Sequence, residues 1–247
     1  MVTNLESARG RYVALLDGDD FWISTDKLQK QTSYLDAHPG TALSFHNAEY
    51  RYRDAAALER HKERAASVPR GGSRFSERFL DVLSEDCSFN HNDMTAWRCA
   101  RGKFSVPASS VMFRRSLFTP VPEWFWEVYY ADKIMQMYLS EFGATRYHSD
   151  ILSCRRFTAG SVSTRQQTLA ETNLIIQESH VMQEVCSSYQ AHGPLSACYL
   201  WQMRYWLERS RYGNALRCLV YAMPNYFQVR ARQGMRWLTS FSGTPSP

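Results

Sequence analysis

Three aspartates grouped around one glycine are the residues of this sequence best placed to do chemistry. Asp17, Asp19 and Asp20 lie beside Gly18, directly after an apolar run at residues 12–16. Like charges this close repel one another and cost stability unless a cation or solvent neutralises them. Carboxylate oxygens beside a residue that permits a tight turn suit a hard divalent cation that keeps open positions for water and phosphate. The alternative is a solvated acidic turn in which Asp20 caps a following helix.

Asp132 is a second carboxylate at a position where chemistry is plausible. It opens residues 133–142, where Ile134, Tyr138 and Phe142 recur at helical spacing. A carboxylate in the first turn of a helix is stabilised by the helix dipole, so a structural role is one interpretation. The same position also leaves the carboxylate free to accept a proton.

The elements that must position these carboxylates alternate between strands and helices. The apolar run before Asp17 predicts a buried strand by its length and its β-branched and aromatic content. The pattern ending at His38-Pro39-Gly40 predicts a helix. The full set of predicted elements is a strand at 12–16, a helix at 25–38, a strand at 42–45, a surface helix and loop at 54–74, an amphipathic helix at 75–83, a strand at 106–113 and a helix at 133–142.

Segments 8–22, 26–31, 106–115, 131–134 and 155–163 follow one another in an order that resembles the family 2 (GT-A type) glycosyltransferases. The resemblance covers about residues 4 to 163. It implies an α/β fold with an incomplete GT-A, Rossmann-like core. Members of the family have about half a nucleotide-binding domain before the position of the first strand, so the resemblance also implies a truncated chain whose first strand has an unpaired edge.

The resemblance assigns roles to the carboxylates. In this family the strand that corresponds to residues 12–16 ends in an Asp-x-Asp motif that carries a metal and the diphosphate of a nucleotide sugar. Asp17 and Asp19 are therefore expected to hold Mg²⁺ or Mn²⁺, and both, with Asp20 and Arg156, are expected to bind the donor diphosphate. Asp132 stands where the family has its catalytic base, which takes the proton of the acceptor hydroxyl during inversion.

Two departures from the family pattern lie at residues 155–163. Arg155 stands where the family has an aromatic residue, and Thr158 stands where it has a histidine. The missing imidazole argues against metal binding by this segment, whereas the guanidinium of Arg156 can still pair with phosphate. Trp124 and Trp126 belong to an aromatic segment at 120–130 and are expected to contact the acceptor, because sugar rings have apolar faces. The alternative for both is packing in the core.

The chain changes character after residue 163. Residues 168–189 and 196–223 have long helical patterns without strand signals, so we predict a partial GT-A domain at 1–163 and a helical C-terminal region at 164–247. Aromatic and arginine residues between Trp201 and Arg217 make this region basic. Packing on the catalytic domain and peripheral contact with anionic lipid are both open interpretations.

The composition adds limits of its own. The net charge is +5, the arginines are spread out, and no phosphate-binding loop or nucleic-acid module is present, so nucleic acid is not an expected partner. Six cysteines without a Cys-x-x-Cys pair indicate a reducing compartment and mostly buried thiols. No apolar run approaches the roughly 18 residues of a membrane span. We therefore predict a cytoplasmic protein, with peripheral attachment to the inner membrane face left open.

Together these features predict an enzyme. It would be an inverting, metal-dependent glycosyltransferase that moves a sugar from a nucleoside-diphosphate sugar to a hydroxyl of a glycan or lipid-linked acceptor. Surface polysaccharide or glycoconjugate synthesis is the expected setting by analogy with the family. The alternative is a non-catalytic truncated remnant that binds a glycan or a protein partner.

Overall fold

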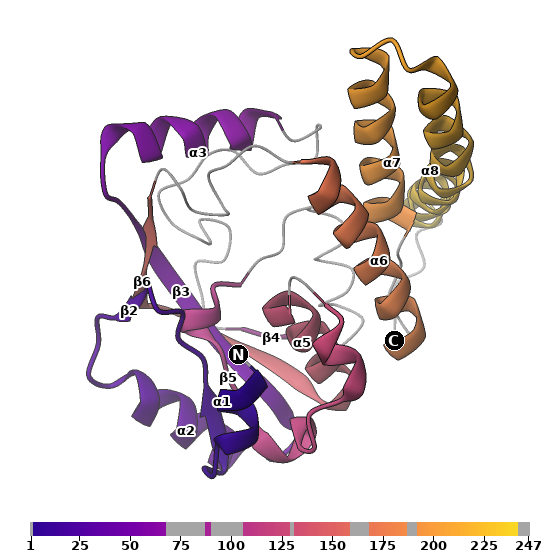
Figure 1. Ribbon diagram of the computed structural model, residues 1–247. Helices are drawn as coiled ribbons and strands as arrows, with labels where there is room; N and C mark the ends of the chain where they lie inside the picture. Colours follow the sequence, from indigo (N-terminus) through magenta and orange to yellow (C-terminus); the bar gives the residue numbers. More distant parts are fainter. Residues whose placement is uncertain are drawn as a thin grey trace. The chain divides into compact units, whose positions relative to one another are not determined.

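A mixed sheet of six strands organises the first part of the chain (Figure 1). The computed structural model describes residues 2–67, 87–89, 106–128, 131–158, 168–186 and 192–241. The strands are β1 (Tyr12–Ala14), β2 (Phe21–Trp22), β3 (Thr41–Tyr52), β4 (Cys87–Phe89), β5 (Met112–Arg114) and β6 (Ala144–Phe157). Their order is β1-β5-β3-β6-β2, and β4 also pairs with β6. β3 and β6 are parallel, and the other pairs are antiparallel.

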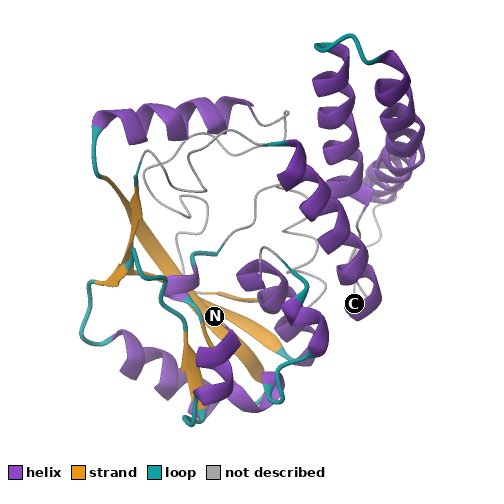
Figure 2. Cartoon of the chain, viewed as in Figure 1, coloured by secondary structure: helices purple, strands orange, loops and turns teal. Residues whose placement is uncertain are grey.

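Helices precede, separate and follow these strands (Figure 2). They are α1 (Val2–Ser7), α2 (Lys27–Ala37), α3 (Ala55–Ser67), α5 (Ala131–Leu139), α6 (Leu169–Val185), α7 (His192–Leu207) and α8 (Tyr212–Phe241). Short 3₁₀ turns occupy Ala108–Ser110, Arg115–Phe118, Glu123–Trp126 and Ser140–Phe142. The α/β class predicted from the sequence is therefore confirmed. None of the helices in the described part of the chain is long and apolar enough to cross a membrane.

β3 is the most deeply buried strand of the sheet. Its first eight residues are buried without interruption, so both of its faces are covered, as expected for a central strand. Phe45 and Tyr147 pack together in the core with Phe113, Met135 and Leu139 from β5 and α5. The four cysteines whose side chains are described are buried free thiols, as predicted: Cys154, Cys186, Cys198 and Cys218.

Local patterns predicted the short elements better than the long strands. The strand expected at 12–16 is β1, and the helices expected at 25–38, 133–142 and the start of 54–74 are α2, α5 and α3. The prediction for 75–83 falls outside the described residues. The strand expected at 106–113 is wrong over most of its length, because Pro107 begins a turn in which its carbonyl accepts a hydrogen bond from the Ser110 hydroxyl (2.8 Å).

The long pairing of β3 with β6 was not predicted. β3 continues seven residues beyond its expected end at residue 45, and no strand was expected at 144–157. The register runs from Thr41 opposite Ala144 to Tyr52 opposite Phe157. Each strand supplies the hydrogen-bond partners of the other, so polar residues with weak strand propensity become part of the sheet.

The chain divides into two compact units. The first contains residues 1–166 and 185–188, and the second contains 167–184 and 189–247. In the second unit the amide of Gln202 on α7 donates hydrogen bonds to Thr172 (2.9 Å) and Asn173 (2.8 Å) on α6. The helical pattern expected at 196–223 is two helices, because the chain turns at Ser210, which has a φ of 55°. α8 also continues through Pro224, where the pattern was expected to end.

Gly143 permits a close backbone contact where the chain enters β6. A Cβ at this position would lie 2.4 Å from the carbonyl oxygen of Gly40, the same oxygen that accepts a hydrogen bond from the Ala144 amide (2.9 Å). We expect Gly143→Ala to lower the free energy of unfolding by about 2–4 kcal/mol, because the backbone must shift to relieve the contact. Urea denaturation measures this loss. Gly40→Ala, which meets no atom within 4 Å, is the control, and equal losses in both variants would contradict the prediction.

Candidate functional site

The turn after β1 is held in place by Asp20. The Asp20 amide donates to the Asp17 carbonyl (3.1 Å), which closes a turn with Gly18 and Asp19 at its centre. One carboxylate oxygen of Asp20 accepts the backbone amide of Arg156 (3.1 Å), and the other accepts the Ser109 hydroxyl (3.0 Å). The carboxylate is buried. Asp20 therefore anchors the turn to β6 and to the 3₁₀ turn at Ala108–Ser110.

This placement revises the expectation for Asp20. Burial raises the pKa of its carboxyl, and the hydrogen bonds from Arg156 and Ser109 oppose that rise. Both oxygens are already used within the protein, so the geometry favours anchoring over contact with a diphosphate. The helix-capping alternative is wrong, because α2 has Asp26 at its N-cap position.

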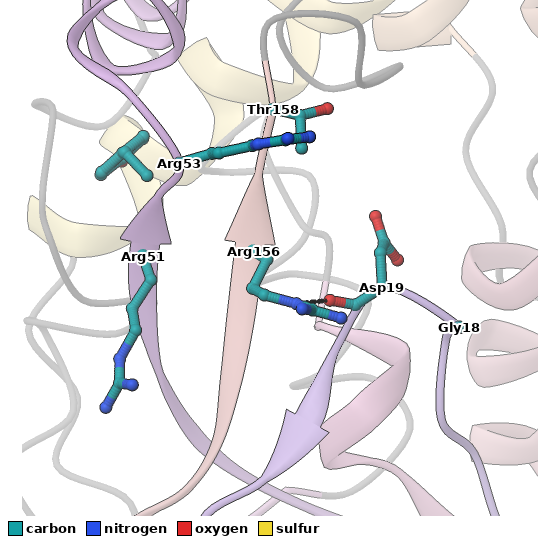
Figure 3. A pocket seen from close by; sticks show the side chains of 7 residues that line it. Gly18, Asp19, Arg51, Arg53, Arg156 and Thr158 are labelled. Carbon is teal, nitrogen blue, oxygen red and sulfur yellow. Dashed lines mark hydrogen bonds between the residues drawn. The ribbon is translucent and has the colours of Figure 1, made fainter.

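Asp17 and Asp19 keep their side chains exposed on the same turn. The side chain of Arg156 donates a hydrogen bond from Nε to the Asp19 carbonyl oxygen, so the backbone of the turn is fixed. Figure 3 shows the Asp19 carboxylate rising from the turn on the side of Thr158, away from that carbonyl. Among the residues that the structure describes, neither carboxylate has a hydrogen-bond or ion-pair partner, so the turn presents both to a ligand.

The charge of Asp132 acts on this turn. The pKa of Asp17 is raised to about 6, first because neighbouring atoms displace part of the water around its carboxyl although the residue remains exposed, and second because of the negative charge of Asp132, the largest contribution from a neighbouring group. Asp20 and Asp19 add smaller repulsions, and Arg155 acts in the opposite direction. Asp132 lies in the first turn of α5, as expected from the sequence. Two carboxylates more than a hundred positions apart in the chain thus share one electrostatic environment.

A pocket of about 510 Å³ opens beside the turn (Figure 3). Arg51 and Arg156 lie opposite each other on the paired strands β3 and β6, and both guanidinium groups lie over the Phe21 ring, at 5.5 and 5.6 Å from its centroid. Arg51 forms an ion pair with Glu49 (2.6 Å). The complete lining consists of Gly18, Asp19, Arg51, Tyr52, Arg53, Arg156 and Thr158.

Arg53 gives the pocket a third guanidinium group, after Arg51 and Arg156. It is exposed and makes no ion pair with any residue in the described parts of the chain. Figure 3 shows its side chain extending across the pocket toward Thr158. Guanidinium groups in a fixed fork suit phosphate oxygens, so Arg53 and Arg156 form a wall whose chemistry suits an anion. Sequence reasoning missed Arg51 and Arg53, although alternate residues on a strand share one face.

The two tryptophans proposed for acceptor binding have different surroundings. Trp124 packs edge-on against Phe118 and Tyr138, with ring centroids 6.2 and 5.1 Å away, and belongs to the margin of the core. Trp126 is 58% exposed. Neither lines the arginine pocket. The structure therefore favours packing for Trp124 and leaves acceptor contact as a prediction for Trp126.

The carboxylates of the turn can be tested for their fit to a divalent cation. Across the described ranges, no group of three or more His, Cys, Asp or Glu side chains is arranged to hold a metal ion. Mg²⁺, however, is usually bound through one or two carboxylates together with water and substrate phosphates. Asp17 and Asp19 offer hard oxygen donors next to the arginine wall, and a dication would relieve the repulsion that raises the pKa of Asp17. The donor set fits such an ion.

A buried lysine contacts Trp22, one of the residues that support the acidic turn. Lys27 is fully buried, its ammonium donates to the side chain of Gln31 (2.8 Å), and it lies 4.5 Å from the centroid of the Trp22 ring. The Trp22 indole donates to the carbonyl of Ser109 (3.0 Å), the residue that also bonds to Asp20. Burial lowers the pKa of Lys27 to about 7. The support of the acidic turn therefore includes a group that titrates near neutral pH.

Replacement of Lys27 should change how the free energy of unfolding depends on pH. Between about pH 7 and its ordinary pKa of 10.5, the unfolded chain binds the proton that the folded chain has released, so this group makes the free energy of unfolding rise with pH. We expect Lys27→Met to remove this rise and to be more stable than wild type at pH 7 by about 2 kcal/mol. Urea denaturation between pH 7 and 10 measures both effects, with the partly exposed Lys62→Met as control. Parallel pH profiles for wild type and Lys27→Met would contradict the prediction.

Comparison with known proteins provides a short match. No family model matches this chain. Three relatives are 50% identical to it over 52 residues, which is 21% of this chain and 15% of each relative. They are Uncharacterized protein Mb1547 of Mycobacterium bovis and, from two strains of Mycobacterium tuberculosis, Uncharacterized proteins MT1570 and Rv1520. The matched segment thus spans about 15% of the length of these relatives, and their names describe no activity.

Proposed function

We propose that this chain is a glycosyltransferase similar to family 2 (GT-A type). It would move a sugar from a nucleoside-diphosphate sugar to a hydroxyl of a glycan or lipid-linked acceptor, with inversion at the anomeric carbon. The observation that carries the proposal is the electrostatic effect of Asp132 on Asp17, on a turn that borders an arginine-lined pocket. Surface polysaccharide or glycoconjugate synthesis is the setting that the family resemblance suggests.

Such a displacement needs cations or hydrogen-bond donors at the departing diphosphate and a base at the attacking hydroxyl. The departing diphosphate gains negative charge, which donors and cations must stabilise. Arg156 and Arg53 would pair with its phosphate oxygens through their guanidinium groups. Asp132 would accept the proton of the attacking hydroxyl as the new bond forms. Asp132 and the arginines would thus act on the two sides of the transferred sugar.

A divalent cation would be held at the turn by Asp17 and Asp19. When bound, Mg²⁺ or Mn²⁺ would offset the charge that develops on the leaving diphosphate. The exposed carboxylates of the turn, its fixed backbone and the mutual repulsion of its charges support this role. Asp20 would contribute by keeping the turn in place.

Donor turnover tests the proposal directly. Purified full chain would be incubated with Mn²⁺ and a panel of nucleoside-diphosphate sugars, and the released nucleoside diphosphate would be measured. We expect release by wild type to be suppressed by a chelator and to fall by about 100-fold or more in Asp19→Asn. Asp26→Asn, an exposed carboxylate at the N-cap of α2, should behave as wild type. Equal turnover in all three proteins, or turnover that a chelator leaves unchanged, would reject the assignment.

The second candidate function is binding of a glycan or a protein partner without turnover. Among the described residues β1 pairs with β5 alone and so forms one edge of the sheet, without the further strands that a complete nucleotide-binding half would place beside it. Calorimetric titration with a nucleoside diphosphate separates the two candidates. Tight binding that requires Mn²⁺ would support the transferase, whereas binding of glycans without any response to nucleotide and metal would support the alternative.

A further inference from the structure

α8 carries an exposed apolar stripe. Tyr212, Leu216, Val220, Met223 and Phe227 are spaced by four, four, three and four residues, which places them within one arc of about 80° on a helix of 3.6 residues per turn. Tyr212, Leu216, Val220 and Phe227 are each at least 60% exposed, and Met223 is also exposed. Isolated apolar residues on a surface need no explanation, but a continuous stripe on one helix face indicates a contact surface.

The stripe is separate from the face that packs within the helical unit. Ala215, Cys218 and Ala222 are the buried residues of α8, and their spacing places them on a different side of the helix. The thiol of Cys218 lies 3.8 Å from the side-chain oxygen of Gln202 on α7. α8 therefore has one apolar face used by the hairpin with α7 and a second face that remains exposed.

The charge of this region is entirely positive. From Arg209 to the last residue the sequence contains six arginines and no aspartate or glutamate. Arg211 and Arg217 are exposed, and neither makes an ion pair with any residue that the structure describes. By contrast, Arg204, which precedes this region, is neutralised by Glu208 at 2.9 Å. An acid-free, arginine-rich helix with an apolar stripe has the composition of segments that lie on anionic membranes.

We propose that the exposed stripe of α8 docks on an anionic membrane surface. The apolar and aromatic side chains enter the boundary between headgroups and acyl chains, and Arg211 and Arg217 pair with lipid phosphates. The charge of this helix favours a membrane over a second copy of the chain as the partner of the stripe. A dimer through this face would place two acid-free, arginine-rich helices against each other, and their positive charges would repel. The inference concerns where the protein is held and does not depend on the proposed transferase activity.

Co-sedimentation with vesicles tests the proposal on the full chain. Vesicles of phosphatidylcholine alone would be compared with vesicles containing one third phosphatidylglycerol, at ~50 mM and ~500 mM salt. We expect binding to the anionic vesicles at low salt, and at least tenfold weaker binding to neutral vesicles or at high salt. Absence of binding to anionic vesicles at low salt would overturn the proposal.

Matched variants distinguish membrane binding by the stripe from non-specific hydrophobic adsorption and from an effect of net charge. A triple variant, Leu216→Gln, Val220→Gln and Phe227→Gln, should bind anionic vesicles at least tenfold more weakly while keeping its helical circular dichroism. Arg211→Gln with Arg217→Gln should weaken binding about fivefold per arginine. The controls are Leu28→Gln, an exposed leucine of α2, and Arg9→Gln with Arg11→Gln, which removes the same charge from the first unit.

The controls should bind as wild type does. Equal binding by the triple variant and wild type would overturn the proposal, because the stripe would then make no contact. A dimer in light scattering that the triple variant converts to monomers would also overturn it, since the face would then be a contact between two copies.

Discussion

Asp132→Asn is expected to lower turnover of a nucleoside-diphosphate sugar by about 10²–10⁴-fold and to leave donor binding nearly unchanged. The amide has the size of the carboxylate but cannot accept a proton from the acceptor hydroxyl. The helix-dipole contribution at the start of α5 is small by comparison, about 0.3–1 kcal/mol, so the fold should survive the change. Initial rates of diphosphate release and calorimetric donor affinity measure the two parts of the prediction.

The same variant provides a second readout that does not require activity. Because Asp132 is the neighbouring charge that most raises the pKa of Asp17, its neutralisation should lower that pKa from about 6 toward the ordinary value of 3.8. Titration of the Asp17 carboxyl by NMR would follow the shift. Glu123→Gln, an exposed acid of the same unit, serves as the charge-matched control. An unchanged Asp17 titration in Asp132→Asn would show that the two carboxylates do not share a site.

Loss of turnover and loss of the electrostatic effect of Asp132 on Asp17 test different parts of the proposal. If Asp132→Asn abolishes turnover and also shifts the Asp17 titration, the carboxylate acts from within the site. If turnover survives but the titration shifts, the geometry is right and another group takes the proton. The two measurements together therefore test the proposed base and the proposed proximity separately.

Local sequence patterns were sufficient to predict the turn that carries Asp17 and Asp19 and the helix that carries Asp132. An apolar run followed by an acidic, glycine-containing turn predicts β1 and the exposed positions of Asp17 and Asp19 without any knowledge of the rest of the chain. The helical period after Asp132 likewise predicts α5 with this residue in its first turn. These features depend on residues close together in the chain, and propensity and periodicity report such features well.

The arginine wall could not be predicted in the same way. Arg51 and Arg53 reach the pocket only because β3 extends beyond residue 45, and that extension depends on hydrogen bonds from β6, about a hundred residues later in the chain. The anchoring role of Asp20 depends similarly on Ser109 and on the amide of Arg156. Pairing between distant segments is decided by packing and backbone hydrogen bonds, which a single local window does not contain.

Asp17→Asn is expected to stabilise the protein and to abolish its response to metal. The folded-state pKa of Asp17, about 6, lies above the ordinary 3.8, so between these pH values the folded chain binds more protons than the unfolded chain. The free energy of unfolding therefore falls as pH rises through this window, and above it the ionised carboxylate destabilises the fold. After allowance for the exposure of the side chain, we expect Asn to raise the free energy of unfolding at pH 7 by about 1 kcal/mol, or the melting temperature by about 2–4 °C.

Thermal unfolding with and without Mn²⁺ tests whether a bound cation compensates the destabilising carboxylate of Asp17. Mn²⁺ should raise the melting temperature of wild type, because it binds the folded state and offsets the repulsion among the carboxylates, and it should have little effect on Asp17→Asn. The stability difference between the two proteins should also shrink as the pH falls from about 6 to 3.8 and vanish below this range, where Asp17 is protonated in both states. Lower stability of Asp17→Asn at pH 7, or equal shifts with Mn²⁺, would contradict the prediction. Strain of this kind is expected at a binding site, where the ligand rather than the fold compensates it.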